Sequence, residues 1–203
     1  MTELILATTS PFRKRLFETL GIDFICEGSD VDEYTSNRPE SAPELVKYLS
    51  RLKAEAVAKN HDSGIIVGFD SVAVYYGGTV NNPLEEILEK PKSREEDFNR
   101  LKKLSGRVHY FYTGIHMINL DNKKTLSDVV ETKAFFRKLN DKEIEKYLSQ
   151  DPMFKKCALG YAPPEYYSST FVKRIEGSPH NLFWGMPVER IMPMLFEIGY
   201  ELK

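Results

Sequence analysis

The feature that most constrains the fold is a long apolar stretch near the middle of the chain. "SGIIVGFDSVAVYY", residues 63–76, is almost entirely apolar or β-branched and is bounded by Gly64 and Gly77. A continuous apolar run, in place of strict alternation, is typical of a central strand that is buried on both faces. We therefore expect this segment at the centre of a sheet that helices flank.

The segments on either side of this strand predict alternating strands and helices. Residues 3–8 are expected as a buried strand, and Ser10 and Pro11 suit the cap and first position of the helix that follows. Capping-box spacing at Ser41 and Ser93 predicts two more helices. The remaining expected elements are a strand at residues 24–28, a hairpin of residues 109–120 and 125–139, a helix at residues 141–149 and a last helix near Pro187.

This order of elements predicts an α/β protein with a mixed sheet, organised as a single domain over residues 1–203. The expected loops are residues 34–42, 77–92 and 159–170. The last of these, "LGYAPPEYYSST", is long and aromatic. It suits either a substrate lid or a well-packed surface loop.

Composition argues against several classes of protein. Hydrophobic residues make up 41% of the 203 residues, enough for a sizeable core. The net charge of −2 argues against a nucleic-acid polymer as partner, because such binders usually carry a basic excess. No apolar run approaches the ~20 residues that span a bilayer, so no membrane partner is expected. Cys26 and Cys157 lack CxxC spacing; a bridge between them stays open, and a reducing, cytoplasmic location is expected.

Asp70 is the anomaly within the apolar stretch. Period-two alternation puts it on the same strand face as Ile66, Gly68 and Val72. A carboxylate in a central strand is costly unless it is paired, hydrogen-bonded or bound to a metal. Gly68 leaves room on this face for another group to approach. Asp70 is therefore either a satisfied structural aspartate or part of a functional site.

A second acidic segment, "SDVDE", follows the strand expected at residues 24–28. The ends of strands are where α/β proteins commonly bind ligands. Mg²⁺ takes carboxylate oxygens, waters and phosphate oxygens. One or two of Asp30, Asp32 and Glu33, together with Asp70, would make a site of that kind. The alternative is an ordinary acidic surface loop.

Hydroxyl and basic residues gather at the first strand-to-helix junction. Residues 8–10 are all hydroxyl residues, and Arg13 lies in the first turn of the expected helix. Free N–H groups at a helix N-terminus favour an anion, whereas basic side chains there oppose the helix dipole. A bound phosphate would supply the missing counter-charge. Lys53 and Lys90 are further candidates, although each also suits a surface lysine. No GxxxxGK[ST] loop is present, which excludes a P-loop NTPase.

Several motifs together resemble one known family. They are "ATTSPFRKRLFETLGIDFICEGSDVDE", "KAEAVA", "IIVGFDSVAV", "EKPKSREE" and "LKKLSGRVHYFYTG", in this order and spacing. They resemble the Maf family of nucleoside triphosphate pyrophosphatases. "VKRIEGSPHN" followed by "GMP" is similar to the C-terminal part of that family. The likeness spans almost the whole chain.

The resemblance implies a fold, a reaction and roles for particular residues. The fold is a long twisted mixed sheet with two lobes around a central cleft, often in a homodimer. The reaction is hydrolysis of a nucleoside triphosphate to a monophosphate and pyrophosphate, with Mg²⁺ or Mn²⁺. Asp70 would accept a proton from the attacking water, and Glu33 would help it to hold the metal. The residues implied in phosphate binding are Ser10, Arg13, Lys53 and Lys90.

The chain departs from the family pattern where the family selects the base. Phe12 stands in the place of the first of two usual arginines, and Ser71 in the place of a usual threonine. "ALGYAPPEYY", residues 158–167, replaces a segment that usually contains a glutamine. The choice between dTTP or UTP and modified nucleotides therefore stays open. Phe12 and Ser71 remain substrate-binding candidates, with Phe12 either stacking on the base or packing against the loop.

Two other functions are compatible with these motifs. One is an inosine or xanthosine triphosphate pyrophosphatase, whose first motif carries asparagine and lysine in place of "SPFR". The other is a non-catalytic nucleotide-binding regulator, for instance one that acts in cell division. The presence of Glu33, Lys53, Asp70 and Lys90 favours an enzyme over a regulator.

Overall fold

The computed structural model describes residues 2–79, 82–150, 157, 159–161 and 166–202. The expected α/β fold is confirmed: a seven-stranded mixed sheet has the order β2-β1-β3-β5-β6-β7, with β4 also paired to β3. The strands are β1 Leu4–Ala7, β2 Ile25–Glu27, β3 Ile65–Thr79, β4 Asn82–Leu88, β5 Val108–Asn119, β6 Thr125–Phe136 and β7 Val172–Gly177. The helices are α1 Pro11–Thr19, α2 Ala42–Ala58, α3 Arg94–Leu104, α4 Asp141–Gln150, α5 Pro179–Trp184 and α6 Val188–Ile198, with a 3-10 turn at Tyr167–Thr170.

The chain divides into two compact units. The first comprises Met1–Ser71, Thr113–Val130 and Trp184–Lys203, and the second comprises Val72–Tyr112 and Glu131–Phe183. Strands β3, β5 and β6 each contribute residues to both units. The single domain expected over residues 1–203 stays a prediction.

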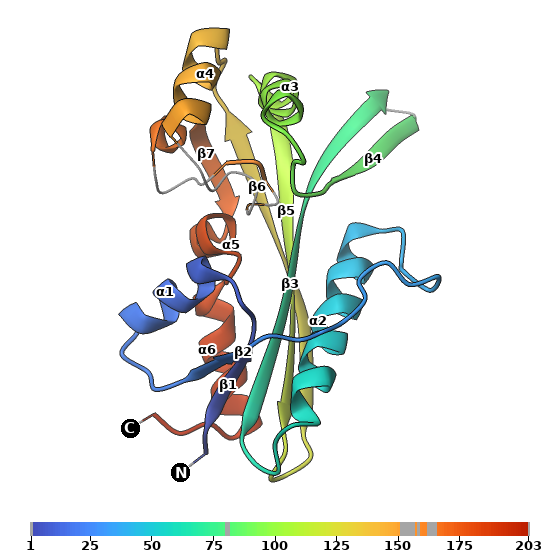
Figure 1. Ribbon diagram of the computed structural model, residues 1–203, viewed down its shortest axis with the longest axis vertical. Coiled ribbons are helices and arrows are strands. Elements are labelled where there is room, and N and C mark those ends of the chain that lie inside the picture. Colours follow the sequence, from blue (N-terminus) through green and yellow to red (C-terminus); the bar gives the residue numbers. More distant parts are fainter. Residues whose placement is uncertain (1, 80–81, 151–156, 158, 162–165, 203) are drawn as a thin grey trace. The chain divides into compact units, whose positions relative to one another are not determined.

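In the first unit, β1 pairs in parallel with β2 on one side and with β3 on the other. Helices α1 and α6 cover one face of these strands and α2 covers the other (Figure 1). Alternate residues of β1 therefore enter different clusters: Leu4 and Leu6 pack with α1 and α6, while Ile5 and Ala7 pack with α2. Burial on both faces is the reason that these strands have no polar alternation.

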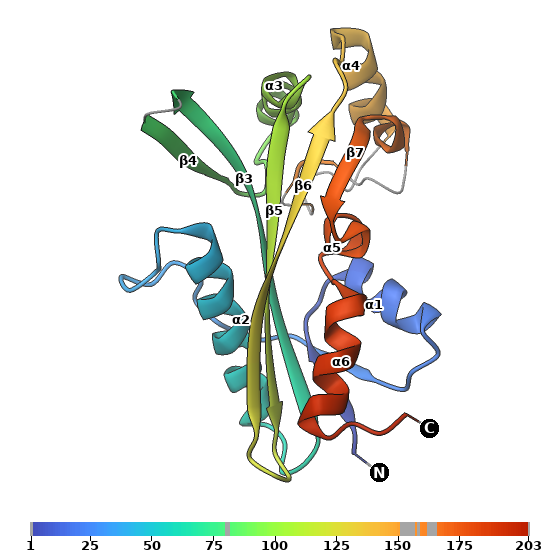
Figure 2. The same cartoon turned by 180° about the vertical axis from the view of Figure 1, so that it is seen from behind.

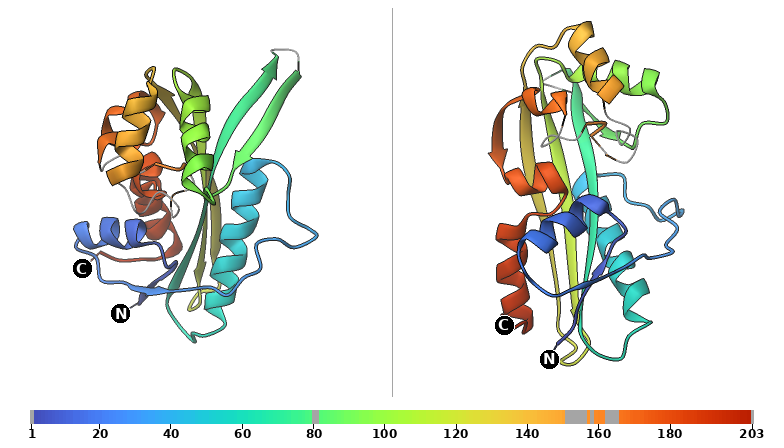
Figure 3. Two further views of the ribbon diagram at one scale, coloured as in Figure 1. Left: turned by 45° about the horizontal axis from the view of Figure 1, so that its top comes forward. Right: turned by 60° about the vertical axis from the view of Figure 1, so that its left-hand side comes forward.

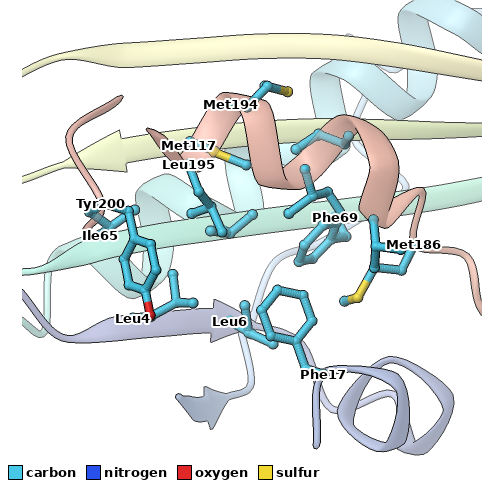
Figure 4. Packing of buried hydrophobic residues seen from close by; sticks show 14 of the residues in the cluster. Leu4, Leu6, Phe17, Ile65, Phe69, Met117, Met186, Met194, Leu195 and Tyr200 are labelled. Atoms are coloured by element: carbon cyan, nitrogen blue, oxygen red, sulfur yellow. The ribbon is translucent and has the colours of Figure 1, made fainter. Parts of the chain in front are cut away.

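The larger cluster of the first unit joins residues of β1, β3 and β5 with residues of α1 and α6 (Figure 4). Phe17 of α1 lies beside Leu6 of β1 and Phe69 of β3, and Leu195 of α6 lies over the same strands (Figure 4). Phe17 and Phe69 are fully buried. This packing fixes α1, and with it the residues of its N-terminal turn, against the ends of the strands.

Helix α2 approaches the sheet unusually closely at two glycines. A Cβ atom built on Gly68 would lie 2.1 Å from the carbonyl oxygen of Ser50, and one on Gly114 would lie 2.1 Å from that of Val46. Gly68 was expected to leave room for another group, and the group that uses this room is the backbone of α2. The glycine therefore serves helix packing.

Strands β5 and β6 form the expected hairpin, which is the long ribbon in Figure 2. The backbone N–H of Asn119 donates to the carbonyl of Lys124, and the side chain of Asn119 accepts from the N–H of Asp121 at 2.9 Å. The amide of Asn119 also donates to the carbonyl of Ile198 at 2.9 Å. The turn is thus tied to the end of α6.

The second unit has its own core between the sheet and helices α3 and α4. These two helices lie side by side (Figure 3). Leu101 of α3 and Tyr147 of α4 are fully buried with Phe136, Tyr161 and Phe171. The ring centroids of Phe136 and Tyr161 are 5.0 Å apart in an edge-on arrangement, a favourable geometry for aromatic pairs.

Helix starts agree with the sequence, with one difference in detail. Ser10 and Ser93 cap α1 and α3 by accepting from backbone N–H groups three residues later. Asn140 and Glu143 bond each other reciprocally at the start of α4. Ser41 precedes α2 as expected, but its hydroxyl donates to the carboxylate of Glu44 instead of capping the backbone.

Two expected loops differ from the sequence interpretation. Residues 77–92 were expected as a loop, but β3 continues to Thr79 and β4 pairs with it from Asn82 to Leu88. Glycines, asparagines and Pro83 indicate a turn, and only the tertiary pairing extends both strands around it. In the segment 159–170, Leu159 and Tyr161 are buried in the second core. The choice between a lid and a packed loop falls partly on residues 162–165, which lie outside the described residues.

Two further expectations concern the cysteines and the membrane. Cys26 and Cys157 are both free thiols. Among the helices of the described ranges, none combines the length and apolarity needed to cross a bilayer.

The contact at Gly68 yields a stability prediction. We expect Gly68→Ala to lower the free energy of unfolding by at least about 2 kcal/mol, because its Cβ would overlap the α2 backbone. Gly77→Ala on the same strand is the matched control, since its nearest neighbour is a Tyr75 side-chain atom at 3.3 Å. Urea unfolding of the two variants checks this. Equal stabilities would contradict the close packing of α2.

Candidate functional site

Three charged side chains of the first unit meet at one nitrogen atom. Nζ of Lys53 lies 2.6 Å from Oδ1 of Asp70 and 2.7 Å from Oε1 of Glu33. Asp70 is only 6% exposed, whereas the side chain of Glu33 is 44% exposed. The two carboxylates therefore converge on one cationic position at the edge of the buried region.

The local sequence explains why these groups meet. Asp70 lies on β3 two residues beyond Gly68, the last residue that pairs with β1. On α2, Ser50 and Ala54 contact Gly68, and Lys53 lies on the same face of the helix. The close approach of α2 at Gly68 therefore brings Lys53 to Asp70. Glu33 comes from the loop after β2, and Asp70 lies just past the part of β3 that pairs in parallel with β1, so both carboxylates lie beyond the carboxyl end of the parallel pairing.

The carboxyl of Asp70 is electrostatically perturbed. Burial raises the pKa of Asp70 above its ordinary value, and the charge of Glu33 raises it further. Lys53, by charge and by hydrogen bond, and Arg13, by charge, lower the pKa and oppose this shift. The raised pKa means that burial outweighs the favourable cations. Asp70 is thus a more basic carboxylate than one at the surface.

Arg13 is the second unusual charge. Its Nε donates to the carbonyl of Gly185 at 3.0 Å, one Nη to Thr8 at 3.3 Å and the other to Ser71 at 2.8 Å. Burial lowers the pKa of Arg13 to about 10, while the charges of Asp70 and Glu33 raise it. Within the described residues, no carboxylate forms an ion pair with this guanidinium. A desolvated cation with neutral partners is a favourable site for an anion.

Two hydroxyls at the start of α1 bond to Arg13, that of Thr8 to its guanidinium and that of Ser10 to its backbone N–H. Ser10 caps the helix, and its own N–H donates to Oγ1 of Thr8 at 3.2 Å. Thr8 therefore accepts from both Ser10 and Arg13. The helix N-terminus, its cap and Arg13 form one polar junction, as the sequence predicted. Its role in phosphate binding stays a prediction.

The other predicted residues have different surroundings. Ser71 contacts Arg13 and, at 2.7 Å, the hydroxyl of Thr113. Phe12 is half-buried and belongs to none of the hydrophobic clusters found among the described residues. Lys90 belongs to the second unit, where it is exposed. The structure thus brings Asp70, Glu33 and Lys53 together and leaves Lys90 in the other unit.

Sequence reasoning missed two groups that contact this site: the hydroxyl of Thr113 and the carbonyl of Gly185. Thr113 is fully buried on β5. A hydroxyl residue within the apolar segment "YFYTGIH" could have indicated a polar contact there. Gly185 carries no side chain that the sequence could have indicated. Its backbone is left-handed, with φ +61°, and only the fold brings it to Arg13.

Of the three acidic residues in the loop "SDVDE", only Glu33 bonds to Lys53. Asp32 accepts from the N–H of Tyr34, and Asp30 is exposed. In the part of the chain that the structure describes, no cluster of three or more histidine, cysteine, aspartate or glutamate residues is close enough to hold a metal.

Comparison with known sequences decides the family. A family model described as "Maf-like protein" matches residues 3–198. The chain belongs to the Maf family. The resemblance found in the motifs is thereby confirmed over nearly the whole chain.

Relatives of this Maf chain carry names that describe an activity. The dTTP/UTP pyrophosphatase of Alkaliphilus oremlandii is 35% identical over 100% of this chain and 96% of its own length. The nucleoside triphosphate pyrophosphatase of Microcystis aeruginosa is 36% identical over 98% of this chain and 96% of its own length. Among solved structures, the Staphylococcus aureus Ham1 protein has a TM-score of 0.43 and 21% identity, over 66% of this chain and 72% of that one.

The raised pKa of Asp70 predicts that this residue lowers stability at neutral pH. Between its unfolded pKa, about 3.8, and its raised folded pKa, the folded state holds a proton that the unfolded state has lost. The stability that Asp70 contributes is therefore present at low pH and lost as pH rises through the folded pKa. We expect the free energy of unfolding of Asp70→Asn to rise relative to that of the wild type above pH 4. The rise should be up to about 1.4 kcal/mol per pH unit between the unfolded and the folded pKa of Asp70.

Denaturant unfolding at a series of pH values measures this difference. Glu40→Gln removes an exposed carboxylate near α2 and is the control. A difference between Asp70→Asn and wild type that stays constant from pH 3 to 8 would show that the pKa of Asp70 is not raised.

Proposed function

We propose that this protein hydrolyses nucleoside triphosphates, of the dTTP/UTP kind or modified, to a nucleoside monophosphate and pyrophosphate. Family membership and the names of the relatives support this reaction. The observation that carries the proposal is the guanidinium of Arg13, whose hydrogen-bond partners are uncharged, beside the Asp70–Lys53–Glu33 cluster. An anion site next to a basic carboxylate is what phosphoanhydride hydrolysis requires.

Phosphate groups would bind to the cations and to the start of α1. Within the described part of the chain, three of the five N–H bonds of Arg13 make hydrogen bonds, which leaves two for phosphate oxygens. The first N–H groups of α1 and the hydroxyl of Ser10 add neutral donors. Lys53 would add a further cation to this set of phosphate ligands, whereas a role for Lys90, which belongs to the second unit, stays a prediction.

The residues present fit a divalent metal. Glu33 and Asp70 each direct one oxygen to Nζ of Lys53, so the two oxygens are close enough to share a metal ion once Lys53 turns toward the phosphates. Mg²⁺ typically uses one or two carboxylates together with waters and substrate phosphates, and Mn²⁺ accepts similar oxygen ligands. When bound, such a metal would neutralise phosphate charge and favour attack at phosphorus.

Asp70 would accept the proton of the attacking water. A general base works best when its pKa approaches the working pH, and burial raises the pKa of Asp70 in that direction. Lys53 keeps the carboxylate ionised by opposing this shift. Glu33, which is more exposed, suits the role of metal ligand and not of base.

Phe12 and Ser71 would contact the substrate in different ways. Phe12 offers an aromatic face on which a base can stack, with little discrimination between bases. Ser71 offers a hydroxyl that is already bonded to Arg13. The homodimer implied by the family resemblance and the cytoplasmic location stay predictions, which light scattering and fractionation of cells would test.

Removal of either carboxylate is expected to impair the reaction, each in a different way. Asp70→Asn should lower the rate of pyrophosphate release at least 100-fold, because the base is lost. Glu33→Gln should raise the Mg²⁺ or Mn²⁺ concentration needed for half-maximal rate, and a chelator should stop the wild type. Pyrophosphate release from a panel of common and modified triphosphates is the measurement.

Glu40→Gln is the matched control for these variants, since Glu40 is exposed beyond the acidic loop. Wild-type rates in Asp70→Asn would refute its role as base. Cleavage of ITP and XTP alone would favour the inosine-type enzyme. Tight nucleotide binding without any hydrolysis by the folded, metal-supplied wild type would favour a regulator.

A second prediction separates base binding from phosphate binding. Phe12→Ala should raise the KM for the preferred nucleotide about 10-fold, because stacking on a base contributes roughly 1–3 kcal/mol. Inhibition by inorganic tripolyphosphate, which has no base, should stay unchanged. An equal loss of affinity for both ligands would show that Phe12 supports the site structurally and does not stack on the base.

A further inference from the structure

The guanidinium of Arg13 is held at three points by segments that are far apart in sequence. Thr8 follows β1, Ser71 lies on β3 and Gly185 lies between α5 and α6. An arginine side chain has many rotamers, and each hydrogen bond removes some of that freedom. The three bonds therefore fix the plane of the guanidinium and the direction of its two remaining N–H bonds.

Ser71 makes the shortest of the three bonds, and its hydroxyl keeps that geometry only if its side chain stays in one rotamer. Guanidinium groups only donate, so Oγ of Ser71 accepts from Arg13 at 2.8 Å. The same oxygen lies 2.7 Å from Oγ1 of Thr113. Whichever of the two hydroxyls donates in this pair, the bond holds Ser71 in the rotamer that meets Arg13.

Thr113 is well suited to anchor Ser71. It is fully buried on β5, and its β-branched side chain has few rotamers. The next residue, Gly114, lies against the backbone of α2 at Val46, which fixes the strand at this point. Thr113 makes no other side-chain hydrogen bond among the described residues, so the hydroxyl of Ser71 is its sole polar partner there.

We propose that Thr113 is a positioning residue for substrate binding: through Ser71 it directs the free N–H bonds of Arg13 toward a phosphate group. This inference rests on the proposed function, because it concerns the same anion site. Thr113 itself does not contact Arg13; its effect passes through Ser71. Loss of the Thr113 hydroxyl should therefore weaken binding of the triphosphate while the fold persists.

Thr113→Val and Thr113→Ser test the proposal. Valine keeps the shape of threonine without the hydroxyl, whereas serine keeps the hydroxyl. We expect Thr113→Val to lower kcat/KM for the preferred nucleotide about 10-fold, mainly through KM, and Thr113→Ser to stay within threefold of wild type. Ser71→Ala should lower kcat/KM as well, and adding Thr113→Val to it should have no further effect.

A measurement that does not depend on activity completes the test. Nε–H of Arg13 donates to Gly185 and should exchange slowly with water in the NMR spectrum of ¹⁵N-labelled wild type. We expect at least 10-fold faster exchange in Thr113→Val and near wild-type exchange in Thr113→Ser. Circular dichroism and thermal unfolding establish that both variants are folded.

The outcomes separate this inference from the proposed function. If wild type hydrolyses no triphosphate, the proposed function fails, and the exchange rate of Arg13 alone decides whether Thr113 positions it. If wild type is active, a Thr113→Val variant with kcat/KM within twofold of wild type and unchanged exchange overturns the inference. A loss that adds fully to that of Ser71→Ala overturns it too, since Thr113 would then act by another route.

Discussion

The contact of α2 with the sheet at Gly68 and Gly114 is the constraint on which the site depends. At both positions a backbone carbonyl of the helix occupies the space of a Cβ atom. Because the helix cannot slide without a clash, its register against β3 is fixed. Lys53 is consequently held beside Asp70, and the strand carrying Thr113 is held beside the strand carrying Ser71.

This rigid packing surrounds two side chains, Asp70 and Arg13, whose charged forms would be better solvated in water. Burial raises the pKa of Asp70 and lowers the pKa of Arg13, so both shifts run against the charged forms. Neutral hydroxyls and a carbonyl, and not carboxylates, hold the guanidinium. Such unfavourable placements persist where the surrounding packing is strong, and they are common at functional sites.

The sequence predicted the helices and strands better than it predicted the tertiary contacts between them. The apolar stretch around Asp70, the cap at Ser10 and the hairpin turn were all predicted, since each depends on local pattern or short-range hydrogen bonding. Residues 77–92 were misread because the glycines and asparagines around their turn also suit a loop. The neighbour that uses the space beside Gly68 stayed open, because a sequence does not tell which element packs there.

By itself, the sequence determined that this chain builds a buried mixed sheet and that Asp70, Glu33, Arg13 and the hydroxyls of residues 8–10 are the chemically unusual groups. Apolar periodicity and capping are local properties, which neighbouring residues express directly. The tertiary structure alone decided that one lysine nitrogen joins Asp70 to Glu33, and that Thr113 and Gly185 secure Arg13. These contacts join residues that are distant in the chain, and helix and strand packing sets their geometry without leaving a local pattern.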